Sequence, residues 1–160
     1  MGYQIDQIIA DYGPLISRIA ATYEADPVEQ KDLVQEVLLA VWQGLSVFKG
    51  EASLKTYVAR IAHYRGVDHV RRHSNKPKSQ PLDDSLVSGA KLEEIADKNL
   101  KLQKLLSEVR QLPLPLRQVA TLALEGFEAR EIADSLGLTP NNAAVRLNRA
   151  KATLKEVMSK

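Results

Sequence analysis

Apolar residues recur at spacings of three and four along most of the chain, which is the pattern of helices that bury one side. In the last third, a short stripe that includes Ile132 ends at Gly137, and glycine can close a helix in the left-handed conformation without steric cost. Thr139 is a good N-cap and Pro140 suits the first helical position, so a second helix is predicted to follow at once and to run toward Met158. The sequence therefore predicts a helix-turn-helix.

The second helix of this pair has a buried side and a polar side. Its apolar stripe consists of Leu147, Ala150, Leu154 and Val157. The residues that lie at or near the other side are Asn141, Asn142, Ala144, Val145, Asn148 and Arg149, and Arg146 also falls in the first turns of this helix. Amide and guanidinium groups can make paired hydrogen bonds to base edges in the major groove and to phosphates, so we predict that this helix binds DNA. The alternative is a helical hairpin that only packs.

Two shorter apolar stripes open the chain, with Gly13 and Pro14 between them. Proline removes a helical hydrogen bond and clashes with the preceding turn, so we expect a break or a sharp kink at this point. Asp26, Pro27 and Glu29 then resemble a capping box that starts a longer helix, because the third residue after an N-cap can bond back to it.

This longer helix is predicted to form the core of the first half. Its apolar side consists of Leu33, Val34, Val37, Leu38, Val41, Trp42 and Leu45. Its other side presents Asp32, Gln35, Glu36 and Leu39. Asp32 and Glu36 lie four residues apart and would repel each other by about a few tenths of a kcal/mol, a cost that a basic partner would relieve. A merely solvated acidic face is the alternative.

Charge is distributed unevenly, although the formal net charge of the chain is only +2. Residues 1–48 carry a net charge of −5, whereas residues 49–78 carry +6. Within the basic stretch, a helix capped by Ser53 is predicted to follow a loop around Gly50. The side chains of this helix that suit phosphates and unpaired bases are Lys55, Tyr57, Arg60, Tyr64, Arg65, Arg71 and Arg72. Tyr57 could equally belong to the core, and a solvated surface is the alternative for the charges.

His69 and His73 are four residues apart, which is also a spacing of zinc ligands. The chain has no cysteine, which excludes disulfides and thiolate sites, and it has no His-Glu-x-x-His pattern, so we expect neither a metal nor a cofactor. It also has no phosphate-cradling glycine loop and no nucleophile motif, so we do not expect an enzyme.

No apolar run approaches the roughly 20 residues that span a bilayer, and the amino terminus lacks the basic and apolar regions of a signal peptide. We therefore expect no membrane insertion and a cytoplasmic location. A hydrophobic content of 44% is sufficient for one domain or two small ones.

Residues 74–90 are polar, contain prolines and a glycine and show no apolar periodicity, so we predict a flexible linker. Fully extended, about 17 residues reach on the order of 55 Å, enough to separate two DNA contacts. Another amphipathic helix is predicted beyond the linker, from Leu92, Ile95, Leu102, Leu105, Leu106 and Val109.

Motifs in the first half are Asp32-Leu33-Val34-Gln35-Glu36, Trp42, Phe48-Lys49-Gly50, Ser53, Lys55-Thr56-Tyr57, Ile61-Ala62 and Asp68-His69-Val70-Arg71-Arg72. In this order they resemble region 2 of the extracytoplasmic-function (ECF) sigma factors of bacterial RNA polymerase. The tail is similar to region 4 of the same family, through Leu112-Pro113, Glu131-Ile132-Ala133, Leu136-Gly137 and Val145-Arg146-Leu147-Asn148-Arg149-Ala150-Lys151. The resemblance covers nearly the whole chain.

The resemblance implies an all-α fold of two small helical domains. Residues 1–73 would be region 2, residues 74–90 the linker and residues 91–160 region 4. It implies an alternative-type sigma factor that directs promoter-specific transcription initiation. The implied partners are core RNA polymerase, promoter DNA and an anti-sigma factor.

The resemblance also implies roles for single residues. The face formed by Asp32, Gln35, Glu36 and Leu39 would bind core polymerase. A pocket for a base turned out of the stack would come from Lys49, Gly50, Glu51 and Ser53. A sigma-like decoy that binds an anti-sigma factor without binding DNA remains the alternative, although such decoys usually lack a basic helix in region 2. A polymerase-independent repressor would leave the first domain unexplained.

Overall fold

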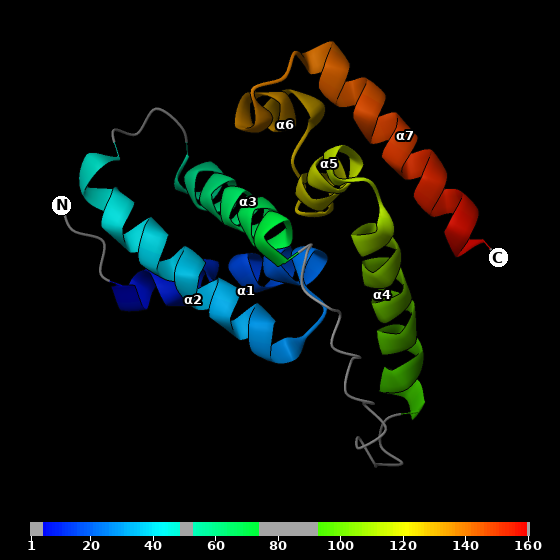
Figure 1. Cartoon of the computed structure of the whole chain (residues 1–160), viewed down its shortest axis with the longest axis horizontal. Helices are drawn as coiled ribbons and strands as arrows, with labels where there is room; N and C mark the ends of the chain where they lie inside the picture. The colour runs from blue at the N-terminus through cyan, green and yellow to red at the C-terminus, as the bar shows by residue number, and fades with distance from the viewer. Residues whose placement is uncertain (1–4, 49–52, 74–92, 160) are drawn as a thin grey trace.

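The computed structural model describes residues 5–48, 53–73 and 93–159, with side chains in the last range described from residue 100 onward. Every regular element in these ranges is helical, as predicted. The elements are α1 (Ile5–Tyr23), α2 (Pro27–Gly44), the 3₁₀ helix η1 (Leu45–Val47), α3 (Leu54–His73), α4 (Glu93–Gln111), α5 (Leu114–Leu124), α6 (Ala129–Leu136) and α7 (Pro140–Met158). Figure 1 shows α1–α3 on one side and α4–α7 on the other. Among the described helices, none is long and apolar enough to cross a membrane.

The first half is a three-helix unit in which α1 packs against both α2 and α3. Fully buried apolar residues at its centre are Ile8, Ile16, Ile19, Leu33, Val37, Val41 and Val58. They occupy the apolar positions of the helical periodicity. Burial of apolar surface stabilises a fold by about 25 cal/mol per Å² and is the main contribution that holds the three helices together.

Helix α1 continues through Pro14, so the chain does not break at this residue. Pro14 and Ala10, whose carbonyl loses its helical partner, both lie on the exposed side, where water can bond to the free oxygen. Ile8 before the proline and Ile16 after it are buried in the same core. Their joint burial holds both parts of the sequence in one helix.

The start of α2 uses the predicted N-cap but not the predicted capping box. The Asp26 carboxylate accepts a hydrogen bond from the Val28 N–H at 3.1 Å. The Asp26 N–H donates to Glu24 at 2.9 Å, and the Glu29 carboxylate instead lies 3.5 Å from Nε2 of His73. Because Glu24, which directly follows α1, already accepts from the N–H of Asp26, Glu29 is not needed there and is turned toward α3.

Helices α1 and α3 approach closely at Gly66. A Cβ atom at this position would lie 2.4 Å from Cδ2 of Tyr23, so the lack of a side chain lets the ring lie against α3. The Tyr23 hydroxyl lies 2.7 Å from Nδ1 of His63, and both residues are buried. Because burial disfavours the charged imidazolium, it lowers the pKa of His63 to about 4. His63 is therefore a neutral core residue.

In the second half, α7 packs against α4, α5 and α6. The buried apolar residues of the second half include Val109, Leu112, Val119, Leu122, Ile132, Ala143 and Ala150. The Arg117 guanidinium of α5 donates to the backbone carbonyl of Arg110 and so joins α5 to α4. Helix α7 therefore covers one side of this half and leaves its own outer side to solvent.

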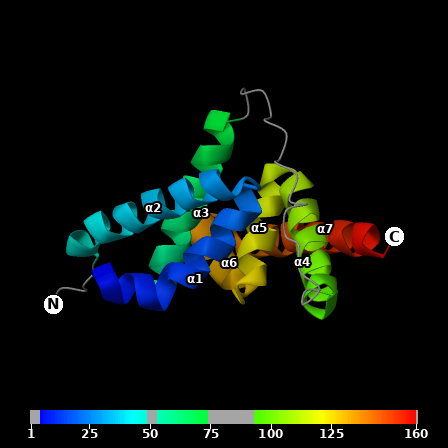
Figure 2. The same cartoon turned by 90° about the horizontal axis from the view of Figure 1, so that it is seen from below.

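The two halves are in contact, as both Figure 1 and Figure 2 show, through α4 and α5 against α1 and through α5 and α6 against α3. The Arg110 guanidinium donates to the carbonyl of Ala21 at 2.8 Å. The Thr121 hydroxyl of α5 donates to the Thr22 hydroxyl of α1 at 2.9 Å, and both threonines are buried. The contact therefore includes polar groups beside apolar residues, which form one core cluster across both halves.

His63 makes the stability of the fold depend on pH. The unfolded chain, with an ordinary histidine pKa of 6.5, binds more protons than the folded chain between pH 6.5 and about pH 4. Stability therefore rises with pH in this window, is fully present above pH 6.5 and is lost as the pH falls, by about 3 kcal/mol in total. Urea unfolding at several pH values measures this slope.

Two variants isolate the contribution of His63. His63→Gln is expected to flatten the slope between pH 4 and 6.5, whereas Tyr23→Phe is expected to lower stability and keep the slope, because the buried imidazole remains. An equal slope in His63→Gln and the parent chain would contradict the assignment.

Candidate nucleic-acid and protein-binding surfaces

The turn between α6 and α7 has the predicted geometry. Gly137 adopts the left-handed conformation, with φ 69° and ψ 33°, and its N–H bonds to the carbonyl of Ala133. The Thr139 hydroxyl accepts from the N–H of Asn142 at 3.1 Å, and Pro140 is the first residue of α7. The predicted helix-turn-helix is confirmed.

The start of α6 carries a capping box that the sequence reasoning missed. The Glu128 N–H donates to the Glu131 carboxylate at 3.0 Å, and the Glu128 side chain caps the N–H of Glu131 in return. The signal in the sequence was the pair of acidic residues three apart, just before the apolar Ile132. This cap fixes where α6 begins and therefore how it presents the turn to α7.

Helix α7 presents most of the predicted DNA-binding residues together on its outer side. Ala143 and Ala150 are buried and set the inner side of the helix. Asn141, Asn142, Val145 and Arg149 are exposed, and Ala144 and Arg146 are partly exposed. Helix α7 contacts only helices of the second half in the described part of the chain. Its outer side is therefore free of contacts with α1–α3.

The outer face of α2 combines acidic and apolar groups. Asp32 and Gln35 are exposed, and the Leu39 side chain is 54% exposed. Trp42, predicted on the buried side, is 51% exposed, so that assignment is wrong. The core closes on Val41 instead, and Trp42 extends the apolar part of this face from Leu39 by one helical turn.

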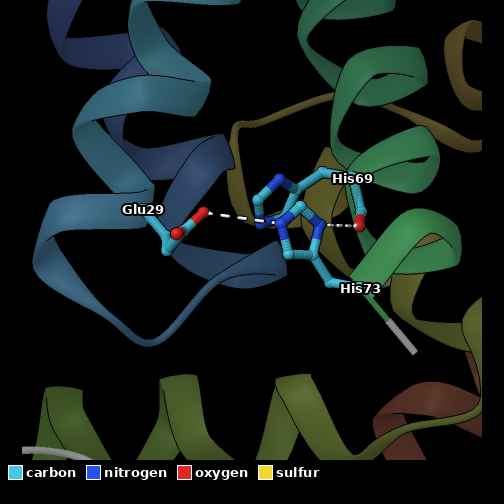
Figure 3. A group of neighbouring side chains, drawn as sticks. All are labelled: Glu29, His69 and His73. Atoms are coloured by element: carbon cyan, nitrogen blue, oxygen red, sulfur yellow. Dashed lines mark hydrogen bonds and ion pairs between the residues drawn. The ribbon is translucent and has the colours of Figure 1, made fainter. Parts of the chain in front are cut away.

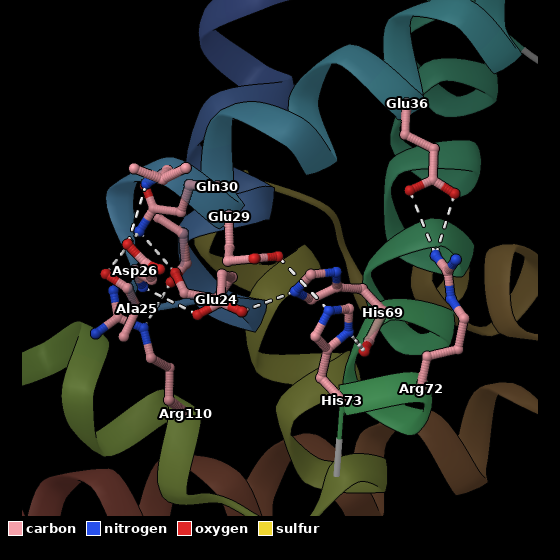
Figure 4. Close-up of polar contacts among 12 residues, drawn as sticks. Glu24, Ala25, Asp26, Glu29, Gln30, Glu36, His69, Arg72, His73 and Arg110 are labelled. Carbon is pink, nitrogen blue, oxygen red and sulfur yellow. Dashed lines mark hydrogen bonds and ion pairs between the residues drawn. The ribbon is translucent and has the colours of Figure 1, made fainter. Parts of the chain in front are cut away.

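Glu36 belongs to the same helix but has partners within the chain. Its carboxylate accepts from the guanidinium of Arg72 at 3.2 Å and of Arg65 at 3.4 Å, as Figure 4 shows for Arg72. For Glu36, α3 therefore supplies a basic partner within the chain. This pairing occupies one predicted polymerase contact and one predicted DNA contact at the same time.

Two predicted DNA contacts of α3 reach the second half. The Lys55 ammonium donates to the carbonyl of Glu125 at 3.3 Å and lies 5.4 Å from the centroid of the Phe127 ring. The exposed Tyr64 donates through its hydroxyl to the carbonyl of Ser135 at 3.2 Å. The same surface therefore serves the contact between the two halves.

The other predicted residues of the basic segment differ in exposure. Lys49, Gly50 and Glu51 lie outside the described residues. Ser53 is exposed and caps α3 as predicted, accepting from the N–H of Thr56 at 3.1 Å. Arg71 is exposed at the end of α3, and Arg60 is partly buried.

Tyr57 packs as a core residue. Its ring centroid lies 4.7 Å from that of Phe48, and burial raises the pKa of its hydroxyl. A Cβ atom at Gly44 would lie 1.9 Å from the same hydroxyl, so glycine makes room for Tyr57. Tyr57 could be a nucleic-acid contact or a core residue, and the structure favours a packing role for most of its ring.

These surfaces define a class of protein. The helix-turn-helix, with its free outer side, is typical of a DNA-binding domain. The three-helix unit presents an acidic and apolar face that suits a protein partner. Family models agree with both halves. Residues 8–76 match Sigma-70 region 2, and residues 102–154 match Sigma-70 region 4.

The similar curated proteins are RNA polymerase sigma factors. The ECF RNA polymerase sigma factor SigM of Mycobacterium tuberculosis is 23% identical over 160 residues, covering 98% of this chain and 78% of the relative. The ECF RNA polymerase sigma-E factor of Escherichia coli is 28% identical over 134 residues, covering 77% and 70%. The probable RNA polymerase sigma factor RfaY of Xanthomonas campestris is 27% identical over 146 residues, and the match spans 88% of this chain but only 36% of that relative.

Solved structures with this fold include CnrH in complex with the cytosolic domain of CnrY, with a TM-score of 0.72, 22% identity and coverage of 97% of this chain and 87% of that chain. The sigma factor RpoE in complex with the anti-sigma factor NepR from Bartonella quintana has a TM-score of 0.75, 18% identity and coverage of 96% of both chains. The chain belongs to the sigma-70 family and is an ECF sigma factor, a non-enzymatic factor for promoter-specific transcription initiation.

The contact between the halves includes an ion pair that can be tested directly. Arg18 of α1 donates through two guanidinium nitrogens to the Glu125 carboxylate, at 2.9–3.1 Å. We expect Arg18→Ala to raise the population of separated halves about two- to fivefold, the range for an ion pair with an exposed partner. Because the chain has no cysteine, dyes on Gln43→Cys and Lys151→Cys can report the separation by energy transfer.

Arg130→Ala, which removes an exposed arginine from α6, is the matched control and should leave the distance distribution unchanged. If Arg18→Ala also leaves it unchanged, the ion pair does not hold the halves together.

Proposed function

We propose that residues 1–73 of this ECF sigma factor act as region 2, residues 74–90 as the linker and residues 91–160 as region 4. In this assignment α2 binds core polymerase, α3 and the loop before it bind and open the downstream promoter element, and α7 reads the upstream element. The observation that carries the proposal is the separation of the two surfaces: the free outer side of α7 lies on one half and the exposed face of α2 on the other. Since core polymerase is the partner, we place the protein in the cytoplasm.

The polymerase surface is proposed to consist of Asp32, Gln35 and Leu39, to which the exposed Trp42 adds apolar area. An aromatic side chain beside a leucine can anchor a protein interface, while charges around it favour a basic partner. By family resemblance, that partner is the clamp coiled coil of the largest polymerase subunit. Glu36 would join this surface when it is released from Arg72.

The DNA surface of α7 is proposed to use Asn141, Asn142, Arg146 and Arg149, with Ala144 and Val145 close to the bases. Asparagine can bond in a paired manner to adenine, and arginine to guanine or phosphate. The amino-terminal turns of a recognition helix are the part that contacts base edges, and these residues lie there. The exposure of these residues on the outer side of α7 supports the assignment.

The downstream element is proposed to bind along α3. Ser53, with Lys49, Gly50 and Glu51 before it, would hold a base turned out of the stack, and Arg71 with Arg72 would bind phosphates. Unpairing a base costs a few kcal/mol, which stacking and hydrogen bonds in such a pocket must return. Arg60 and Tyr57 would support this surface from the partly buried side of α3.

Lys55 and Tyr64 add a condition to this proposal. Both contact the second half in the structure, so full use of α3 by DNA requires α5 and α6 to move away. We propose that the arrangement of Figure 1 is the form without DNA and that the halves separate when promoter DNA binds. The extended reach of residues 74–90, on the order of 55 Å, would permit that separation.

An anti-sigma factor is the further proposed partner. Two structural relatives are in complexes with CnrY and with the anti-sigma factor NepR. A protein of this kind could hold the halves together and cover α2 at the same time. The alternative, a decoy that binds an anti-sigma factor without binding DNA, leaves the exposed row on α7 without a role.

Run-off transcription with purified core polymerase tests the function. The parent chain should support transcripts from a cognate promoter. The variant with alanine at Asn141, Asn142, Arg146 and Arg149 should not, because it lacks the groups that bind the upstream element. A single base contact should cost about 1–3 kcal/mol and relax the preference at one position, whereas a phosphate contact should weaken all sequences alike.

Lys155→Ala, near the end of α7, is the control and should retain transcription. Activity of the quadruple variant equal to that of the parent would exclude α7 as the reading helix, and absence of transcripts from the parent on all promoters would favour the decoy.

The α2 surface is tested by binding to core polymerase. Asp32→Lys combined with Leu39→Ala should weaken affinity by about tenfold or more, equivalent to about 1.4 kcal/mol, because it reverses a charge and removes an apolar contact. Helix content should not change, since both side chains point outward. Asp11→Lys, an equal charge reversal on the exposed side of α1, should bind as the parent does. Equal affinity of the double variant and this control would rule out the α2 surface.

A further inference from the structure

We propose that Glu29, His69 and His73 form a binding site for one divalent transition-metal ion, of the kind that zinc represents. The inference does not depend on the proposed function. One ligand atom from each of the three residues lies within 4.8 Å of the other two. Figure 3 shows Glu29 pointing from α2 toward the two histidines of α3. The sequence offered only the two histidines, and the fold supplies the third ligand from another helix.

The hydrogen bond of His73 determines which nitrogen it offers. Its Nδ1 lies 2.8 Å from the backbone carbonyl of His69, and because a carbonyl can only accept, Nδ1 must carry the proton. The neutral ring then has its lone pair on Nε2, which faces the Glu29 carboxylate. A histidine held through Nδ1–H by a backbone carbonyl, with Nε2 available, is a common form of metal ligand.

The distance between Nε2 of His73 and the Glu29 carboxylate is 3.5 Å. Two groups with lone pairs repel each other at this distance unless a cation lies between them. A charged hydrogen bond would be shorter, at about 2.7–2.9 Å. Two ligands of a tetrahedral zinc ion, each about 2.0–2.1 Å from the metal, lie about 3.3–3.4 Å apart, which is close to the separation observed here.

His69 is the most deeply placed member of the site, with its side chain 5% exposed. Its ring stacks on that of His73, with centroids 4.0 Å apart and an interplanar angle of 29°. Its Nε2 lies 2.7 Å from the Glu24 carboxylate, as Figure 4 shows. Two imidazoles thus face two carboxylates, and this second carboxylate adds charge that favours a dication and fixes the ring of His69.

The donor set selects the class of ion. Imidazole nitrogen with carboxylate oxygen suits zinc and neighbouring transition metals, whereas magnesium and calcium prefer oxygen ligands alone. Three protein ligands leave a fourth position for water. A bound ion would join the first turn of α2 to the last residue of α3 and so stabilise the three-helix unit.

The test uses the full chain without a histidine tag, freed of metal by a chelator and titrated with zinc chloride by calorimetry. We expect one ion per chain and an increase of Tm, since an ion that binds the folded chain alone stabilises it. Glu29→Gln and His73→Gln should each weaken zinc binding by at least about tenfold and reduce the increase of Tm. Magnesium should produce no comparable effect.

Asp68→Asn is the matched control, because Asp68 is exposed on α3 beside His69 and outside the cluster, and it should bind zinc as the parent does. Circular dichroism establishes that the variants fold, and Glu29 and His73 were chosen because both are partly exposed. The proposal is wrong if the parent shows no saturable binding of one zinc ion, or if folded Glu29→Gln and His73→Gln bind zinc with the affinity of the parent.

Discussion

Helix α1 must bury two of its sides at once, and the rest of the structure depends on this requirement. Ile8, Ile16 and Ile19 fill the core shared with α2 and α3. The apolar residues of α1 belong to a core cluster that continues into the second half, and polar groups of α1 take part in the same contact. The second half meets those groups: Thr121 bonds to Thr22, and Arg110 bonds to the carbonyl of Ala21.

This second contact changes how the basic helix α3 is used. Lys55 is directed at the carbonyl of Glu125 and Tyr64 at that of Ser135, both in the second half. Arg72 is paired within the first half, with the carboxylate of Glu36. In the proposed function, the same groups of α3 would be directed at phosphate oxygens of DNA. Under that proposal, DNA has to compete with contacts inside the same chain.

Local signals made much of the fold and of the α7 surface predictable. Gly137, Thr139 and Pro140 define the turn through backbone preferences that act within a few residues, so the helix-turn-helix follows from the sequence. The surface positions of Asn141 and Arg149 follow from the helical period once Ala150 is placed inside.

The sequence predictions were wrong or incomplete at positions whose structure depends on contacts with distant parts of the chain. Pro14 lies within a helix because Ile8 and Ile16 share one core, which no local rule contains. Trp42 fits the apolar spacing, yet the core closes at Val41. Glu29 satisfies the spacing of a capping box, but Glu24 takes that role and leaves Glu29 to face α3. Packing between helices, not the period of one helix, determined these three positions.

The buried pair of Thr22 and Thr121 bears on how easily the two halves could part. The Thr121 hydroxyl donates to the Thr22 hydroxyl when the halves touch, and the Thr22 hydroxyl donates to the carbonyl of Ile19 within α1. Water can replace the contact between the two threonines after separation, so neither state leaves a buried group unpaired. An apolar seam of the same area would resist wetting, because its surface has no bonds to offer water. Hydroxyls on facing helices instead make a contact that water can enter and leave at small cost in free energy.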